Sequence, residues 1–173
     1  MRELSQIRDA VVSALAAEGM AALDAYPDQR ARRDGWPVGA RRYGCPVAAV
    51  AVETAESRTV GFCNYLGEVF DTGAGAPREL YGKQLEAVIS IEIRGQRAAD
   101  CEQGCETAAE VLLERLPAGI RPGELNWEAL TWERETGLFL RRGRLRCRAY
   151  FLARAEEGDT VFLDFRLKGA VTT

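Results

Sequence analysis

Two segments of the chain carry hydrophobic residues at the spacing of one face of an α-helix. In residues 3–18 and again in residues 98–116, apolar side chains recur every three or four positions, which places them in a single stripe. Pro117 and Gly119 follow the second segment, as is typical of a helix end. We therefore predict two amphipathic helices. The expected buried stripes are Leu4, Ile7, Val11, Ala14 and Leu15, and then Cys101, Cys105, Ala108, Leu112 and Leu116.

Other segments alternate between apolar and polar residues with a period of two, which is typical of β-strands. The clearest alternation lies in residues 80–94, where one face is expected to be buried. That face holds Leu85, Ala87, Ile89, Ile91 and Ile93. Further strands are predicted at 20–26, 47–54, 59–70, 127–135, 138–154 and 161–167. A turn at 55–58 would join the strands at 47–54 and 59–70 into a hairpin.

The predicted order is a helix, four strands, a second helix and three strands. This order predicts an α+β fold: a mostly antiparallel sheet with two main helices packed on one face. At ~150 residues per domain, residues 1–173 are expected to form a single domain. Residues 27–46 and 71–79 are rich in glycine and proline and are predicted to be protruding loops. The tail at 168–173 is expected to be loose.

The composition argues against several kinds of catalytic and metal site, but it does not identify a function. The chain has no histidine, so the usual general base and the commonest metal ligand are both missing. It also has no phosphate loop, no dinucleotide-binding glycine motif and no nucleophile elbow. Five cysteines without an export signal favour free, buried thiols over disulfides or a metal site. We expect no enzymatic activity, no cofactor, no metal and no membrane span, and we expect an intracellular protein.

A row of arginines is the most distinctive pattern in the sequence. Arg142, Arg144, Arg146 and Arg148 occupy every second position, so in a strand they share one face. Three partners are open: glutamates across the sheet, an acidic patch on another subunit, or nucleic-acid phosphates. The glutamates available across the sheet are Glu86, Glu92, Glu133 and Glu135. Direct nucleic-acid binding is the least favoured, because only Tyr150 shares this face for base stacking.

The first predicted loop is a second candidate interface. Arginine, tryptophan and tyrosine are the residue types that most often dominate partner binding. The net charge of the chain is only −3, so the local clusters are more informative than the total. The candidate residues in this loop are Arg30, Arg32, Arg33, Trp36, Arg41, Arg42 and Tyr43.

The order of elements resembles a known family. A helix ending in residues 14–19 (ALAAEG) leads to a strand that closes at Tyr26-Pro27. A hairpin, the long strand with residues 85–93 (LEAVISIEI), a helix and C-terminal strands follow. This pattern covers most of the chain and resembles the small α+β proteins of phage tails, particularly the tail terminators (tail-completion proteins).

The resemblance implies a non-enzymatic virion protein that forms a ring, commonly a hexamer. Such a ring caps the tail tube and joins it to the head. The implied partners are further copies of the chain, the tail tube protein, and a neck or connector protein. The implied location is the bacterial cytoplasm and then an assembled virion or phage-like particle. A head–tail connector or other neck protein is an alternative within this class. A small nucleic-acid-binding module that uses the arginine row is the alternative outside it.

Overall fold

The computed structural model describes residues 2–24, 46–60, 64–73, 75–154 and 164–167. Apart from Pro46, the predicted loop at 27–46 lies outside the described residues, and so does the predicted tail at 168–173. The described parts of the chain form two helices and eight strands. In chain order they are α1 (Arg2–Ala17), β1 (Ala21–Leu23), β2 (Val47–Thr59), β3 (Tyr65–Asp71), β4 (Ala76–Gly95), α4 (Ala98–Glu114), β5 (Ile120–Trp127), β6 (Thr131–Glu133), β7 (Leu138–Arg154) and β8 (Asp164–Leu167).

The strands form a mixed sheet built around two long central strands. The strand order is β1-β2-β4-β7-β5, with β3 on β4 and with β6 and β8 on β7. Only β1 and β2 are parallel among the described pairs, and the others are antiparallel. The predicted α+β class and its mostly antiparallel sheet are therefore confirmed.

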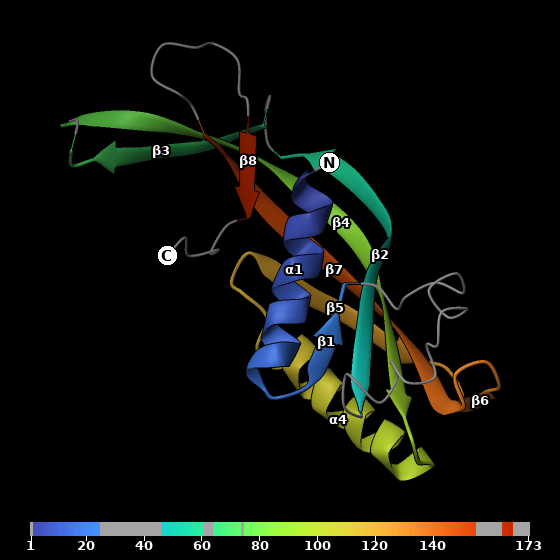
Figure 1. The fold of residues 1–173 in the computed structure, drawn as a ribbon. Coiled ribbons are helices and arrows are strands. Elements are labelled where there is room, and N and C mark those ends of the chain that lie inside the picture. Colours follow the sequence, from blue (N-terminus) through green and yellow to red (C-terminus); the bar gives the residue numbers. More distant parts are fainter. Residues whose placement is uncertain (1, 25–45, 61–63, 74, 155–163, 168–173) are drawn as a thin grey trace.

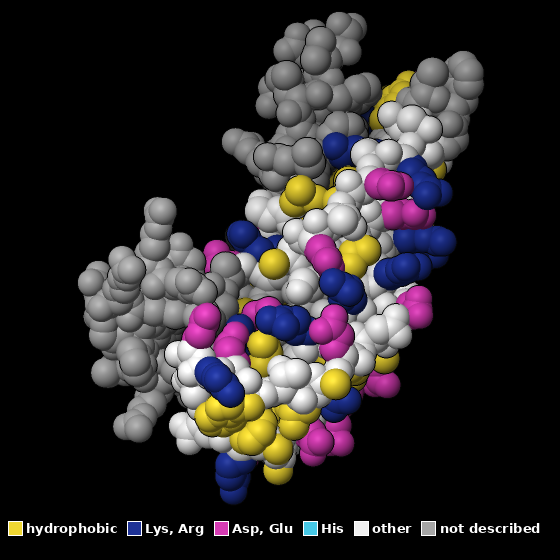
Figure 2. Space-filling model, turned by 90° about the vertical axis from the view of Figure 1, so that its right-hand side faces the viewer, with side chains coloured by type: hydrophobic (Ala, Val, Ile, Leu, Met, Phe, Trp, Pro, Cys, Tyr) yellow, Lys and Arg dark blue, Asp and Glu magenta, His cyan; other side chains and the backbone are white. Residues whose placement is uncertain are grey.

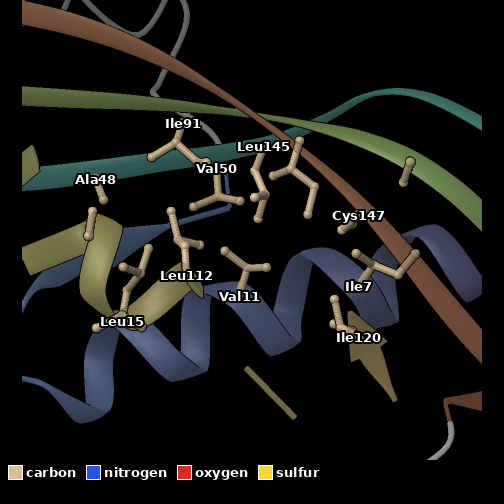
Figure 3. Packing of buried hydrophobic residues seen from close by; sticks show 14 of the residues in the cluster. Ile7, Val11, Leu15, Ala48, Val50, Ile91, Leu112, Ile120, Leu145 and Cys147 are labelled. Atoms are coloured by element: carbon tan, nitrogen blue, oxygen red, sulfur yellow. The ribbon is translucent and has the colours of Figure 1, made fainter. Parts of the chain in front are cut away.

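Both helices pack on the same face of this sheet (Figure 1). The α1 side chains of Ile7, Val11 and Leu15 are fully buried. In Figure 3 they point toward the sheet, where Val50 and Leu145 meet them. The helical spacing in the sequence is thus explained, because each apolar stripe is the side that the sheet removes from water.

The long strand β4 also carries the predicted buried face. Leu85 and Ala87 are each 3% exposed, and Ile89, Ile91 and Ile93 are fully buried against the helices. The partner residues on β7 continue this face, since Leu145 lies opposite Ile89 and Cys147 lies opposite Ala87. The core is therefore a layer between α1 and α4 on one side and β2, β4 and β7 on the other.

The predicted hairpin between 47–54 and 59–70 is wrong. Strand β2 continues through the expected turn to Thr59 and pairs with β4, not with β3. Ala55 faces Ala87 and Ser57 faces Leu85 across this pair. Local residue preferences favour a turn at 55–58, but the length of β4 provides hydrogen-bond partners beyond it. The register shifts between Val52 and Thr54, as a bulge does.

The true hairpin joins β3 to β4 and replaces most of the second predicted loop. Asp71 ends β3 and Ala76 begins β4, so only the residues between them connect the strands. Asp71 stabilises this turn, because its Oδ1 accepts a hydrogen bond from the Gly73 N–H at 2.9 Å. The connection is accordingly shorter than the predicted loop at 71–79.

The predicted strand at 127–135 is instead two short strands, β5 and β6. Both pair with β7, β5 at Ile120–Trp127 and β6 at Thr131–Glu133. Strand β5 starts earlier than predicted because it is an edge strand, where Pro122 is tolerated without a ladder hydrogen bond. A register shift between Pro122 and Leu125 accommodates this proline.

Candidate interaction surfaces

The arginine row lies on the sheet face opposite the helices. The side chains of Arg142, Arg144, Arg146 and Arg148 are 50%, 57%, 74% and 62% exposed. Between them, Leu145 and Cys147 point into the core and are at most 4% exposed. The predicted two-sided character of this strand is therefore confirmed.

Each arginine of the row has a glutamate nearby. Arg142 Nε lies 3.0 Å from Glu92 Oε1, and Arg148 Nε lies 3.6 Å from Glu86 Oε1. These two pairs are the cross-strand contacts that the sequence predicts. Glu133 does not join them, because it binds Arg94.

The two remaining arginines pair with glutamates outside the predicted set. Arg144 Nε donates to Glu53 Oε2 at 2.9 Å, and Glu128 lies 3.6 Å away. The hydrogen bond with Glu53 and the negative charges of Glu53 and Glu128 raise the pKa of Arg144. Arg146 has a looser pair, since 4.0 Å separates its Nη1 from Glu124 Oε2. Exposed pairs like these fix geometry more than they add stability.

The open sheet face carries as many acidic as basic side chains in its described part. On the face shown in Figure 2, blue and magenta side chains are interspersed along the molecule. A surface that binds nucleic-acid backbone needs a clear positive excess. The described part of this face has no such excess. Its exposed or partly exposed charged residues are Arg58, Arg121, Arg142, Arg144, Arg146 and Arg148, with Glu53, Glu56, Glu86, Glu92, Glu124 and Glu128.

A groove crosses this face between β2, β4, β7 and β5. Its volume is about 690 Å³, and it is open to solvent. The apolar residues that line it include Val88 and Pro122, while Arg121, Arg146 and Arg148 contribute positive charge. The groove also contains Glu56, Glu86 and Glu124.

The β3–β4 hairpin is an exposed arm that the sequence analysis missed. It comprises residues 65–82, and Figure 1 shows β3 and the first part of β4 extending away from the helices. Four large apolar side chains remain exposed on it: Tyr65 at 37%, Leu66 at 42%, Val69 at 51% and Phe70 at 63%. The hydrophobic pattern of 59–70 predicts a buried strand face, but this arm lies beyond the helices that would bury it. The signal was visible only as two adjacent apolar residues, Val69 and Phe70, which cannot share one face of a strand.

One face of this arm is also acidic. Glu68 lies directly opposite Glu79 in the hairpin register. Tyr81 Oη donates a hydrogen bond to Glu79 Oε2 at 2.6 Å, and the Tyr81 ring meets Tyr65 edge-on. Desolvation and the negative charges of Glu68 and Glu79 raise the pKa of Tyr65. Two like charges at opposed positions disfavour the isolated hairpin.

Arg94 is a buried charge at the other end of β4. Its side chain is 3% exposed, and it donates to both carboxylate oxygens of Glu133 at 2.9 and 3.1 Å. Glu92 Oε2 lies 2.8 Å from its Nη1. Burial disfavours its charge, but the Glu133 hydrogen bond and the charges of both glutamates outweigh this, so the pKa of Arg94 is raised. The bidentate geometry ties β6 to β4, which is a structural role.

The described cysteines are buried in the core. Burial raises the pKa of Cys105 to about 12 and that of Cys147 to about 11, and it also raises the pKa of Cys101. Thiols in this state are poor nucleophiles and poor metal ligands. No group of three or more acidic or cysteine side chains in the described residues could hold a metal ion.

The other predicted interface lies outside the described residues. These are the loop side chains of Arg30, Arg32, Arg33, Trp36, Arg41, Arg42 and Tyr43. Their role stays a prediction.

The fold and these surfaces define an α+β protein with one helix-covered and one open sheet face. No protein-family model matches the chain, and no curated protein matches it. A solved chain described as "Virion of native gene transfer agent (GTA) particle" is similar over 84% of this chain and 96% of that one, at 14% identity and a TM-score of 0.38. At this TM-score the likeness carries no argument about a shared role. No helix in the described ranges is long and apolar enough to cross a membrane.

Proposed function

We propose that this protein is a structural subunit of a phage-like particle, of the tail-terminator type. In this role it forms a ring, expected to be a hexamer, that caps the tail tube and joins it to the head or neck. The order of helices and strands that resembles the terminators is the order found in the fold. The observation that carries the proposal is that one subunit exposes two chemically different surfaces, the apolar arm and the charged sheet face.

A cyclic ring requires such a pair of surfaces. In a ring, each subunit contacts its neighbours head-to-tail, so two different patches must complement each other. A monomer has no use for four exposed large apolar side chains on one projecting hairpin, and patches of this kind mark interaction sites. The sheet and its two helices form the packed body that carries the charged face and from which the arm projects (Figure 1).

The role is proposed to be non-enzymatic. The groove on the open face is accessible to solvent and of mixed charge. The carboxylates that line it have arginine partners, for example Glu86 with Arg58 at 3.0 Å and with Arg148.

The test is the assembly state of the purified full chain. Native mass spectrometry and negative-stain electron microscopy should show a discrete closed ring, alone or on added tail tubes. Added tube protein should stop growing once the ring is bound. A chain that stays monomeric at all concentrations, with tube protein present, contradicts the proposal. A ring that binds connector but not tube protein would place the chain elsewhere in the neck.

The nucleic-acid alternative is separated by a mobility-shift titration. A sheet that neutralises phosphates binds DNA at low salt and loses affinity steeply as salt rises. We expect no shift even at low salt, because the glutamates on this face balance the arginines.

A further inference from the structure

We propose that the β3–β4 arm of one copy docks in the groove on the open sheet face of a second copy. This inference rests on the proposed function, since it names the contact that would close the ring. The arm combines an exposed aromatic side chain with two carboxylates, and the groove combines an apolar lining with arginines that stand beside its three glutamates.

The arm presents an apolar knob beside two carboxylates. In the hairpin register, Phe70 lies opposite Pro77 and Glu68 lies opposite Glu79. Residues two positions apart on a strand share a face, so all four lie on the same side of the arm. Phe70 is the most exposed of the large apolar side chains on the described surface, at 63%.

The groove offers the complementary chemistry. Val88 and Pro122 give it an apolar lining, and its volume of about 690 Å³ is ample for an aromatic side chain. Arg146 and Arg148 stand at its edge, 74% and 62% exposed. Their partners within the chain are 4.0 and 3.6 Å away, so both can turn toward additional carboxylates at little cost.

Pairing between two arms is disfavoured on electrostatic grounds. Two arms that met through the Phe70 face would bring two copies of Glu68 and two copies of Glu79 together. Like charges brought together at an interface disfavour the contact. Arm-to-groove docking instead matches carboxylates with Arg146 and Arg148, and it repeats head-to-tail as a ring requires.

The arm also has a reason to need a partner. A two-stranded hairpin is marginally stable in water, and this one carries opposed glutamates. Placing Glu68 and Glu79 next to arginines of a neighbour removes the repulsion, and covering Phe70 removes apolar surface from water.

The experiment compares two variants of the full chain by native mass spectrometry. The arm variant is Phe70→Ser, and the groove variant is Arg146→Glu with Arg148→Glu. Each is expected to weaken ring assembly at least tenfold while circular dichroism and thermal melting show a folded chain. A matched control should assemble normally: Leu113→Ser with Trp132→Ser changes exposed apolar residues elsewhere on the described surface.

An exchange of charges between the arm and the groove distinguishes loss of the contact from misfolding of a variant. Glu68→Arg with Glu79→Arg is expected to abolish the ring on its own. Combined in one chain with Arg146→Glu and Arg148→Glu, it should restore the ring, which no misfolded chain would do. Failure of this restoration, when each parent variant is folded, overturns the arm-to-groove contact.

Mixing the arm variant with the groove variant distinguishes head-to-tail docking from arm-to-arm pairing. Each retains one intact surface, so head-to-tail docking predicts a one-to-one heterodimer and no ring. Arm-to-arm pairing predicts no mixed dimer.

If wild-type rings form and the arm variant still assembles, this inference fails and the proposed function stands. If the wild-type chain stays monomeric even with tube protein, the proposed function fails and the second-copy contact fails with it. If the wild-type chain forms rings only on added tail tubes, the variants are compared with it in the presence of tail tubes.

Discussion

Strand β4 passes through two regions with opposite physical character. From Leu85 to Ile93 it lies under α1 and α4, and its inward side chains are at most 3% exposed. From Ala76 to Glu79 it forms the arm with β3, and its side chains face solvent. The backbone hydrogen-bonding is continuous across both regions. What differs is the helix layer, which ends before the arm begins. The helix-covered part of the fold, here called the body, can thus be stable by itself. The arm, in contrast, needs a partner surface that covers its apolar side chains.

Truncation of apolar side chains should show the largest difference in free energy of unfolding between the two regions. Ile91→Ala removes a fully buried side chain and should lower the free energy of unfolding by about 2–5 kcal/mol. Phe70→Ser in the arm should change it by less than about 0.5 kcal/mol, because that side chain is already in water. Urea unfolding of the monomeric chain measures both. Equal losses at the two sites would contradict the contrast between body and arm.

Removal of the buried charge of Arg94 should have the next largest effect on the free energy of unfolding. Arg94→Met removes three close contacts and takes the bidentate cation from the largely buried Glu133, while Glu92 keeps Arg142. We expect a loss of about 2–3 kcal/mol. The double variant Arg94→Met with Glu133→Met should recover part of this loss in a double-mutant cycle. A single variant as stable as wild type would show that the pair does not hold β6 to β4.

Gly104 tests the packing of α4 on the sheet. A Cβ atom added here would lie 2.8 Å from Pro46 Cβ and 2.9 Å from Ile93 Cγ2. Alanine favours a helix over glycine by about 1 kcal/mol, but this overlap should reverse the sign, giving a net loss of about 1–2 kcal/mol. Ser13→Ala, on the exposed side of α1, is the control and should not destabilise. A rise in Tm for Gly104→Ala would mean that α4 packs less closely than the structure shows.

The arginine row should give the smallest effect on folding. Arg144→Gln removes ion pairs with Glu53 and Glu128, but all three side chains are well exposed. We expect a melting temperature close to that of wild type in both low and high salt. A large loss of stability, abolished by salt, would instead make the row a folding element of the body.

The elements that the sequence predicts well are those set by local periodicity. The stripe Ile7, Val11 and Leu15 identifies α1, and the alternation from Leu85 to Ile93 identifies β4, because one buried face dictates each pattern. Strand partners are not encoded locally. Nothing in residues 55–58 shows that β4 is long enough to keep β2 extended.

The candidate surfaces were predicted in the same uneven way. The spacing of Arg142 to Arg148 is a local pattern, so their shared open face could be predicted. Arg94 looks like another polar-face residue of β4, and its burial depends on Glu133, which lies 39 residues away in the chain. The arm was missed because its apolar residues match a buried strand, and only the end of the helix layer reveals that they are exposed.

Hydrogen–deuterium exchange across a concentration series compares the stability of the body with that of the arm in the monomer and in the ring. Amides around Ile89 and Ile91 should be protected at every concentration, since the body is stable alone. Amides of β3, from Tyr65 to Asp71, should exchange rapidly in the monomer and become protected as the ring assembles. If the arm amides exchange at the same rate in both states, the arm is not the contact surface, and the account is contradicted.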